Sequence, residues 1–128
     1  MDKLYIPGDL VSVYVGIKKY IVEVIGTENE NEVLSYQIKF PNGEIQYADK
    51  DNIVPIPLTP EILEKNGWKK KLSVYYVHPI YNIEIIVARD NPSTWFILMG
   101  IFPEERISCV SDLQHYLSRK GYESEMEV

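Results

Sequence analysis

The sequence predicts an α+β protein with a five-stranded barrel, a short helical connector, and a three-stranded antiparallel sheet packed with one helix. The first half contains five short segments that alternate apolar and polar residues between turn formers. A capped helical segment follows, and the second half holds three apolar segments and one amphipathic helix. We therefore expect a barrel over 1–58, a connector over 59–71, and the sheet with its helix over 72–128.

The predicted barrel strands cover residues 10–15, 20–26, 34–40, 44–48 and 53–56. In the central hairpin, Tyr36, Ile38 and Phe40 share one face of their strand. The return strand places Ile45 and Tyr47 together on one of its faces. We expect these apolar faces to fill the barrel.

Three polar segments connect these strands. "TENENEV" is too poor in apolar residues to pack, which predicts a solvated loop. "PNGE" carries Asn42 and Gly43, a pair that predicts the centre of a type I′ turn. "DKDN" predicts one tight turn, and Pro55 and Pro57 restrict the strand after it to an edge or rim.

The connector "PLTPEILEKNGW" has the signals of a two-turn helix. Thr59 is a favoured N-cap, Pro60 fits the first helical position, and Gly67 fits the position after the helix. A helix this short needs tertiary contacts, so Ile62, Leu63 and Trp68 are expected to dock it to a core.

The second half predicts three strands over 72–77, 83–88 and 94–101, joined by the turn-rich segments "HPIYN" and "RDNPS". A helix is expected over 110–120, where Val110, Leu113 and Leu117 form an apolar stripe and Gly121 ends the helix. The tail "YESEMEV" is expected to add an edge strand or to fray.

Composition limits the function classes. The net charge is −6 with a pI of 4.9, and neither half is basic, which disfavours a nucleic-acid binder of the ordinary basic kind. A single cysteine suggests a reducing compartment. The first ten residues lack the apolar core of a signal peptide, and no apolar run approaches the roughly 20 residues that span a bilayer. We expect a cytoplasmic protein.

Metal-binding and catalytic residues are scarce. Cys109, Asp112 and His115 lie three apart along the last helix, but His78 has no second ligand beside it, so a zinc site is not expected. A Cys109–His115 nucleophile pair would be turned apart by their spacing on a helix. Phosphate-binding, dinucleotide-binding and hydrolase motifs are absent. We expect no catalytic residues, metal or cofactor.

The aromatic residues allow two interpretations. Several rings around one pocket could cage a cationic group by cation–π contacts. Tyr20, Tyr36, Phe40 and Tyr47, however, fall on the faces expected to fill the barrel, so core packing is favoured. Tyr14 is the aromatic expected to be exposed.

A local basic patch would allow the chain to bind nucleic acid despite its acidic total charge. Adjacent aromatic and cationic side chains suit phosphate contact and base stacking, provided that the two groups meet in the fold. The candidate residues are Lys18, Lys19, Trp68, Lys69, Lys70 and Lys71. The alternative is a solvated basic connector.

A protein interface is the remaining candidate. The segment "TWFILMGIF" is apolar on both faces, and the strand over 53–56 or the tail could accept a strand from another chain. The alternative for "TWFILMGIF" is an ordinary core strand, which is favoured.

Two parts of the chain resemble known families. Residues 7–57 resemble an SH3-like barrel of the Tudor type in "PGDLVSV", "YIVEVIG", "YQIKFPNGE" and "YADKDNIVPI". This resemblance implies a fold and no single function, because many activities occur on this barrel. The connector "PLTPEIL-KNGW" and the helix "V--LQH-L---G" resemble an uncharacterised family of bacterial mobile-element and phage proteins. That resemblance implies a genomic setting only.

The function predicted from the sequence is a non-catalytic accessory or adaptor protein of a phage or integrated element, with another protein as its partner. Nucleic-acid association through the lysines is the alternative, and a small enzyme of unknown class is the third hypothesis. The oligomeric state and the independence of the two halves stay open.

Overall fold

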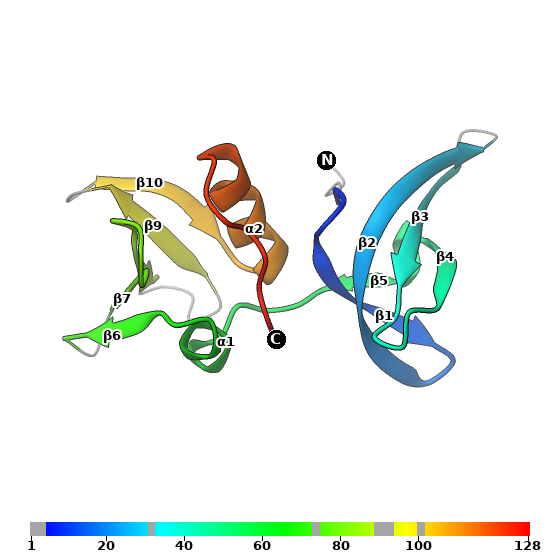
Figure 1. Cartoon of the computed structure of the whole chain (residues 1–128), viewed down its shortest axis with the longest axis horizontal. Coiled ribbons are helices and arrows are strands. Elements are labelled where there is room, and N and C mark those ends of the chain that lie inside the picture. Colours follow the sequence, from blue (N-terminus) through cyan, green and yellow to red (C-terminus); the bar gives the residue numbers. More distant parts are fainter. Residues whose placement is uncertain (1–4, 31–32, 73–74, 89–93, 100–101) are drawn as a thin grey trace.

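The computed structural model describes residues 5–30, 33–72, 75–88, 94–99 and 102–128. They form a mostly β protein with two antiparallel five-stranded sheets and two α-helices. The two sheets lie at opposite ends of the long axis, and the C-terminal helix lies between them (Figure 1). The "RDNPS" turn at 89–93 and the last two residues of the predicted third strand, 100–101, lie outside the described residues.

The N-terminal sheet has the strand order β4-β3-β2-β1-β5. Its strands are β1 (Leu10–Val15), β2 (Lys18–Glu30), β3 (Val33–Lys39), β4 (Ile45–Asp49) and β5 (Ile53–Pro55). The polar turn predicted from "DKDN" is a 3-10 helix, η1 (Lys50–Asn52), and it leads the chain from β4 to β5. All five strands lie close to their predicted places.

The prediction of a closed barrel is wrong for the described residues. β5 pairs with β1 only along Val11–Val13, and no ladder joins β4 to β1 or β5. β5 has three residues and ends at Pro55, which has no backbone N–H to donate. So short a strand leaves the sheet open between β4 and the end of β1.

The described residues of the acidic segment predicted as a loop, 27–30 and 33, belong to two paired strands, and residues 31–32 lie outside the described residues. β2 continues to Glu30 and β3 begins at Val33, with Glu28 opposite Ser35 and Asn29 opposite Leu34. These paired strands run beyond the core, where polar side chains can stay solvated on both faces. Backbone pairing therefore holds a segment whose composition favoured a loop.

The central hairpin turns differently from the prediction. Gly43 has a positive φ of 91°, whereas Asn42 does not, so the turn is not type I′. The Gly43 N–H donates to the Phe40 carbonyl and the Phe40 N–H donates to the Glu44 carbonyl, which fits a type I turn followed by a glycine bulge. Pro41 presets φ at the second turn position and explains this choice.

The connector helix is confirmed. α1 (Pro60–Lys65) begins after Thr59, whose side chain accepts from the Ile62 N–H, and Gly67 follows it at φ 86°. Leu63 and Trp68 are buried in the C-terminal core. The following Lys69–Lys71 is a strand, β6, rather than part of a solvated connector.

The C-terminal sheet has five strands instead of the predicted three. Its order is β10-β9-β8-β7-β6, and the further members are β7 (Tyr75–Val77), β8 (Glu84–Val87), β9 (Trp95–Met99) and β10 (Phe102–Ile107). The sequence hides β6 and β10 because both are edge strands rich in charge, and β10 also contains a bulge between Pro103 and Glu105.

Each sheet has its own buried cluster. α2 (Val110–Arg119) places Val110, Leu113 and Leu117 in the C-terminal core, which confirms the predicted stripe. Trp95 and Ile97 of β9 lie in the same core, which agrees with the core-strand interpretation of "TWFILMGIF" at these two positions. The N-terminal core is smaller and is built around Tyr36, with no described helix of its own half over it.

Candidate functional site

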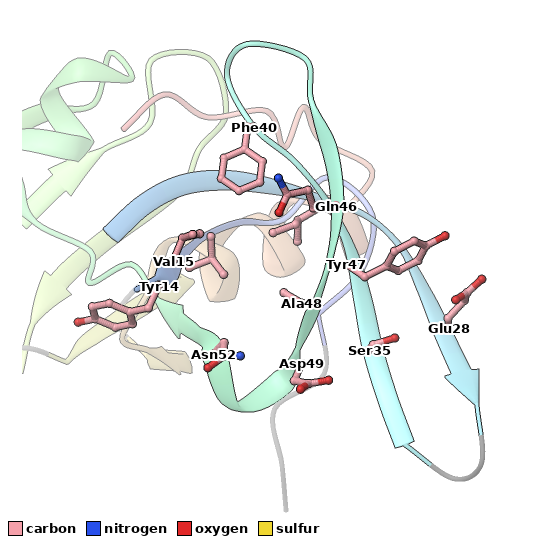
Figure 2. A pocket seen from close by; sticks show the side chains of 12 residues that line it. Tyr14, Val15, Glu28, Ser35, Phe40, Gln46, Tyr47, Ala48, Asp49 and Asn52 are labelled. Atoms are coloured by element: carbon pink, nitrogen blue, oxygen red, sulfur yellow. The ribbon is translucent and has the colours of Figure 1, made fainter. Parts of the chain in front are cut away.

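A hollow of about 580 Å³ lies on the N-terminal sheet, where the sheet fails to close. Its walls come from β1, β2, β3, β4 and the end of η1 (Figure 2). The floor is apolar, because Val13, Ile38 and Ala48 line it and belong to the buried N-terminal core. The hollow therefore offers an apolar base within a shallow, solvent-facing site.

The rim of the hollow combines aromatic and polar side chains. Phe40 and Gln46 lie at one end and Asp49 and Asn52 at the other, and Tyr14 lines the hollow from β1 with its ring directed outward (Figure 2). The rings of Phe40 and Tyr20 pack edge to face with their centroids 5.7 Å apart, which holds Phe40 at that end of the rim. The amides and carboxylates can hydrogen-bond a ligand that the floor contacts through apolar surface.

The hollow is electrostatically negative. Glu28 and Asp49 line it, whereas no described lysine, arginine or histidine does. These two carboxylates flank Ser35 in one row across β2, β3 and β4. Lys19 lies beside one lining residue, with its Nζ 5.9 Å from the centre of the Tyr14 ring. Such a lining favours cationic partners and disfavours phosphate groups.

The structure corrects two of the predicted core aromatics. Tyr36 is buried at 1% exposure as expected, but Tyr47 is 57% exposed and Tyr20 is 38% exposed. Ala48, not Tyr47, is the β4 residue in the N-terminal core, so alternation turns Tyr47 to the opposite face. Tyr14 is exposed at 46%, as its alternation predicts.

The candidate basic residues do not form one patch. Lys18 and Lys19 begin β2 in the N-terminal sheet, whereas Lys69–Lys71 form β6 at the far edge of the C-terminal sheet (Figure 1). Trp68 is 4% exposed and lies edge to face with His78, so its ring is not available for base stacking. The two groups of lysines therefore lie in different sheets, and nucleic-acid association through them stays a prediction.

A polar junction joins the two halves through α2. The Gln114 side chain accepts from the Leu10 N–H and donates to the carbonyls of Gly8 and Ser124. Beside it, Asp9 is 1% exposed, and its carboxylate accepts from the Ile6 N–H and contacts Nε2 of His115 at 2.6 Å. A buried carboxylate requires such partners, so this network ties the start of β1 to α2.

A second pocket of about 450 Å³ lies beside this junction and includes His115 and Arg106. His115, which lines this pocket, contacts Asp9 and so links α2 to the start of β1. Cys109 is buried and its Sγ lies 3.3 Å from the Ser111 oxygen, while His115 contacts Asp9.

His78 occupies a structural turn. Its Nδ1 accepts from the N–H groups of Ile80 and Tyr81, and its ring packs against Trp68 and Tyr81. Burial lowers the pKa of His78 below its ordinary value of 6.5. In the described ranges, no three histidine, cysteine, aspartate or glutamate side chains gather as metal ligands. No described helix is both long and apolar enough to cross a bilayer.

Comparison of the chain with protein-family models, curated proteins and solved structures found no match. The resemblances to SH3-like barrels and to mobile-element proteins therefore stay predictions from the sequence.

The hollow was not predicted as a site. Tyr14 was singled out from the sequence, but the other rim residues were interpreted as core or as turn residues. The sequence signal that could have indicated an open sheet is the short, proline-bounded fifth strand.

Proposed function

We propose that this chain is a non-catalytic adaptor that binds another protein through the hollow on its N-terminal sheet. The observation that carries the proposal is the uneven distribution of exposed apolar side chains. Of the eleven large apolar side chains that are exposed among the described residues, nine precede residue 58. Tyr14, Val15 and Tyr47 belong to this group and line the hollow. Exposed apolar groups gathered around a concavity are typical of interaction sites.

The charge of the hollow supports a protein partner over a nucleic acid. Phosphate binding requires cationic side chains, and the hollow presents Glu28 and Asp49 instead. The lysines of the alternative hypothesis lie in two separate sheets. A protein segment that brings a basic residue and apolar side chains would match both the rim and the floor.

The finer fold and the setting belong to the same proposal. We interpret the N-terminal sheet as an open relative of the SH3-like barrel, which η1 and the return of β5 to β1 support. The connector and C-terminal helix support an accessory role in a phage or integrated element. The single buried cysteine supports action in the cytoplasm.

The test is affinity capture of partners by the tagged full chain from a lysate of the organism that encodes it, with and without nuclease. Val15→Lys places a cation in the hollow at a position that is 50% exposed. Ile80→Lys is the matched control, because Ile80 is 79% exposed on the C-terminal half.

We expect wild type and Ile80→Lys to capture the same protein regardless of nuclease, and Val15→Lys to lose it. A partner that Val15→Lys retains, or one that nuclease releases, would contradict the proposal. Nuclease-sensitive capture that Lys69→Glu abolishes would support the nucleic-acid alternative instead.

A further inference from the structure

The four sheet edges of this protein are protected to different degrees. β5 contains Pro55, β6 consists of three lysines, and β10 carries Pro103 and consecutive charged residues. These are features that keep an edge from pairing with another chain. β4 reads Ile-Gln-Tyr-Ala-Asp, with no proline or lysine and with its one charge at the end. β4 is therefore the edge on which another strand can pair.

The hairpin determines which β4 residues bond to β3 and which direct their backbone groups outward. The Phe40 N–H donates to the Glu44 carbonyl, and ladder pairs then alternate along the antiparallel register. Gln46 and Ala48 consequently bond to β3. Ile45 and Tyr47 direct their backbone N–H and C=O groups to the free side of β4, where no described strand pairs with them. Asp49 directs its N–H there, whereas its C=O begins η1 as the N-cap carbonyl.

The free side of β4 borders the hollow. Four consecutive β4 residues, 46–49, line it from both strand faces, as expected where a cavity reaches around an edge. The opposite wall is the end of β1, where Tyr14 and Val15 extend beyond the last β5 pair at Val13. The hollow is thus bounded by two strand edges that β5 leaves uncovered.

We propose that the partner binds as an extended segment that adds an antiparallel sixth strand to β4 and places alternate side chains in the hollow. This inference rests on the proposed function and specifies its binding mode. Backbone pairing to Ile45, Tyr47 and Asp49 would supply affinity, and side-chain alternation would supply specificity.

The neighbours of such a strand define the chemistry of the segment. A residue opposite Asp49 joins the row that contains Ser35 and Glu28, so it is basic. Residues opposite Tyr47 and Ile45 meet exposed apolar surface and are apolar or aromatic. The residue opposite Ala48 enters the hollow and is apolar. Read from its N-terminal end, the segment therefore carries a lysine or arginine, then two consecutive apolar residues, then any residue, then a third apolar residue.

A second copy of this chain is a poorer occupant. Each chain carries a net charge of −6, and pairing of two β4 strands would bring two acidic rims together. The charge complementarity that the hollow requires is therefore met by a basic segment of another protein.

The test uses peptides selected from a random phage-displayed library on the immobilised full chain, then synthesised and measured by fluorescence anisotropy. Tyr47→Pro removes an outward N–H without removing a bond to β3, and proline is tolerated at such edge positions. Tyr47→Ala is the matched control, because it lacks the same ring but keeps the N–H. Tm and near-ultraviolet circular dichroism verify that both variants are folded.

We expect selected peptides to carry a basic residue followed by two consecutive apolar residues, with a third apolar residue two positions further on. Tyr47→Pro should bind them about tenfold more weakly than Tyr47→Ala, because one backbone hydrogen bond is lost and the proline ring blocks the edge. Asp49→Lys should reverse the preference for a basic residue. Asp49 makes no side-chain cap bond to η1, so this change does not remove a capping interaction.

Equal binding by Tyr47→Pro and Tyr47→Ala would overturn strand addition, as would failure to enrich any peptide. Concentration-dependent dimers of the free chain that Tyr47→Pro abolishes would show a second copy at this edge instead. These results would reject strand addition only. The adaptor proposal would still hold if wild type captures a protein from the lysate and Val15→Lys does not. If the selected peptides bind as expected but Val15→Lys captures the same protein as wild type, the adaptor proposal alone would be rejected.

Discussion

Each half of this protein contains one antiparallel five-stranded sheet, but the two sheets differ in how much of their apolar surface is buried. The C-terminal sheet is packed with α1, α2 and the tail around a core that includes both tryptophans. The N-terminal sheet forms a smaller cluster, and most of the exposed apolar side chains of the described chain lie in its half. The C-terminal half completes its core with its own helices, whereas the N-terminal half leaves more of its apolar surface exposed.

The largest expected effect tests the core of the C-terminal half. Leu113 is 0% exposed in α2, so Leu113→Ala should lower the free energy of unfolding by about 2–5 kcal/mol. Ile80→Ala, at a position 79% exposed, should change it by less than about 0.5 kcal/mol. Urea denaturation followed by tryptophan fluorescence measures both. Similar losses for the two variants would remove the contrast in burial.

The next effect tests the junction between the halves. Gln114→Ala leaves the Leu10 N–H and the Gly8 and Ser124 carbonyls without this partner, which should cost about 1–3 kcal/mol. Ser118→Ala, on the exposed end of the same helix, should cost less than about 0.5 kcal/mol.

The same variant separates the unfolding of the two halves. Both tryptophans lie in the C-terminal core, so their fluorescence reports that half, whereas far-ultraviolet circular dichroism reports both sheets. We expect coincident transitions in wild type and separated transitions in Gln114→Ala. Coincidence in both proteins would show that other contacts couple the sheets.

A smaller effect should appear in the pH dependence of the C-terminal half. Burial lowers the pKa of His78 in the folded state, so the unfolded chain binds a proton first as the pH falls. Stability is therefore greatest above pH 6.5 and decreases as the pH falls from there toward the folded pKa. Between pH 8 and pH 5, the Tm of wild type should fall by more than the Tm of His78→Asn. A constant difference would contradict this role of His78.

The smallest expected effect concerns the exposed surface of the N-terminal half. Ile17 is 100% exposed in the turn between β1 and β2, so Ile17→Ser should change the free energy of unfolding by less than about 0.5 kcal/mol. Urea denaturation of both proteins measures the change. A loss of more than about 1 kcal/mol would show that this turn contributes to folding.

Alternation and capping residues predicted much of the fold. The five N-terminal strands, the Thr59 cap and the apolar stripe of α2 follow local patterns that the structure keeps. The failures occur where tertiary pairing overrides composition. Lys69–Lys71 has no apolar face, yet it pairs with Tyr75–Val77 at a sheet edge. The acidic end of β2 is likewise held by its partner strand.

The site was less predictable than the fold. Alternation indicated that Tyr14 is exposed, but it could not decide which face of β4 is buried, so Tyr47 was assigned to the core. A one-residue change in the turn decides that question: Gly43 occupies a bulge instead of the centre of a type I′ turn. The hollow depends on where β5 stops pairing, which is a long-range property of the sheet.

The most direct test of the N-terminal interaction surface is amide hydrogen exchange of the full chain, free and bound to its captured partner, read by mass spectrometry. We predict slowed exchange on binding in residues 45–49 and 13–15, with the β6 lysines unchanged. Protection confined to 69–71, with 45–49 unaffected, would contradict the account and would place the interaction on the C-terminal sheet.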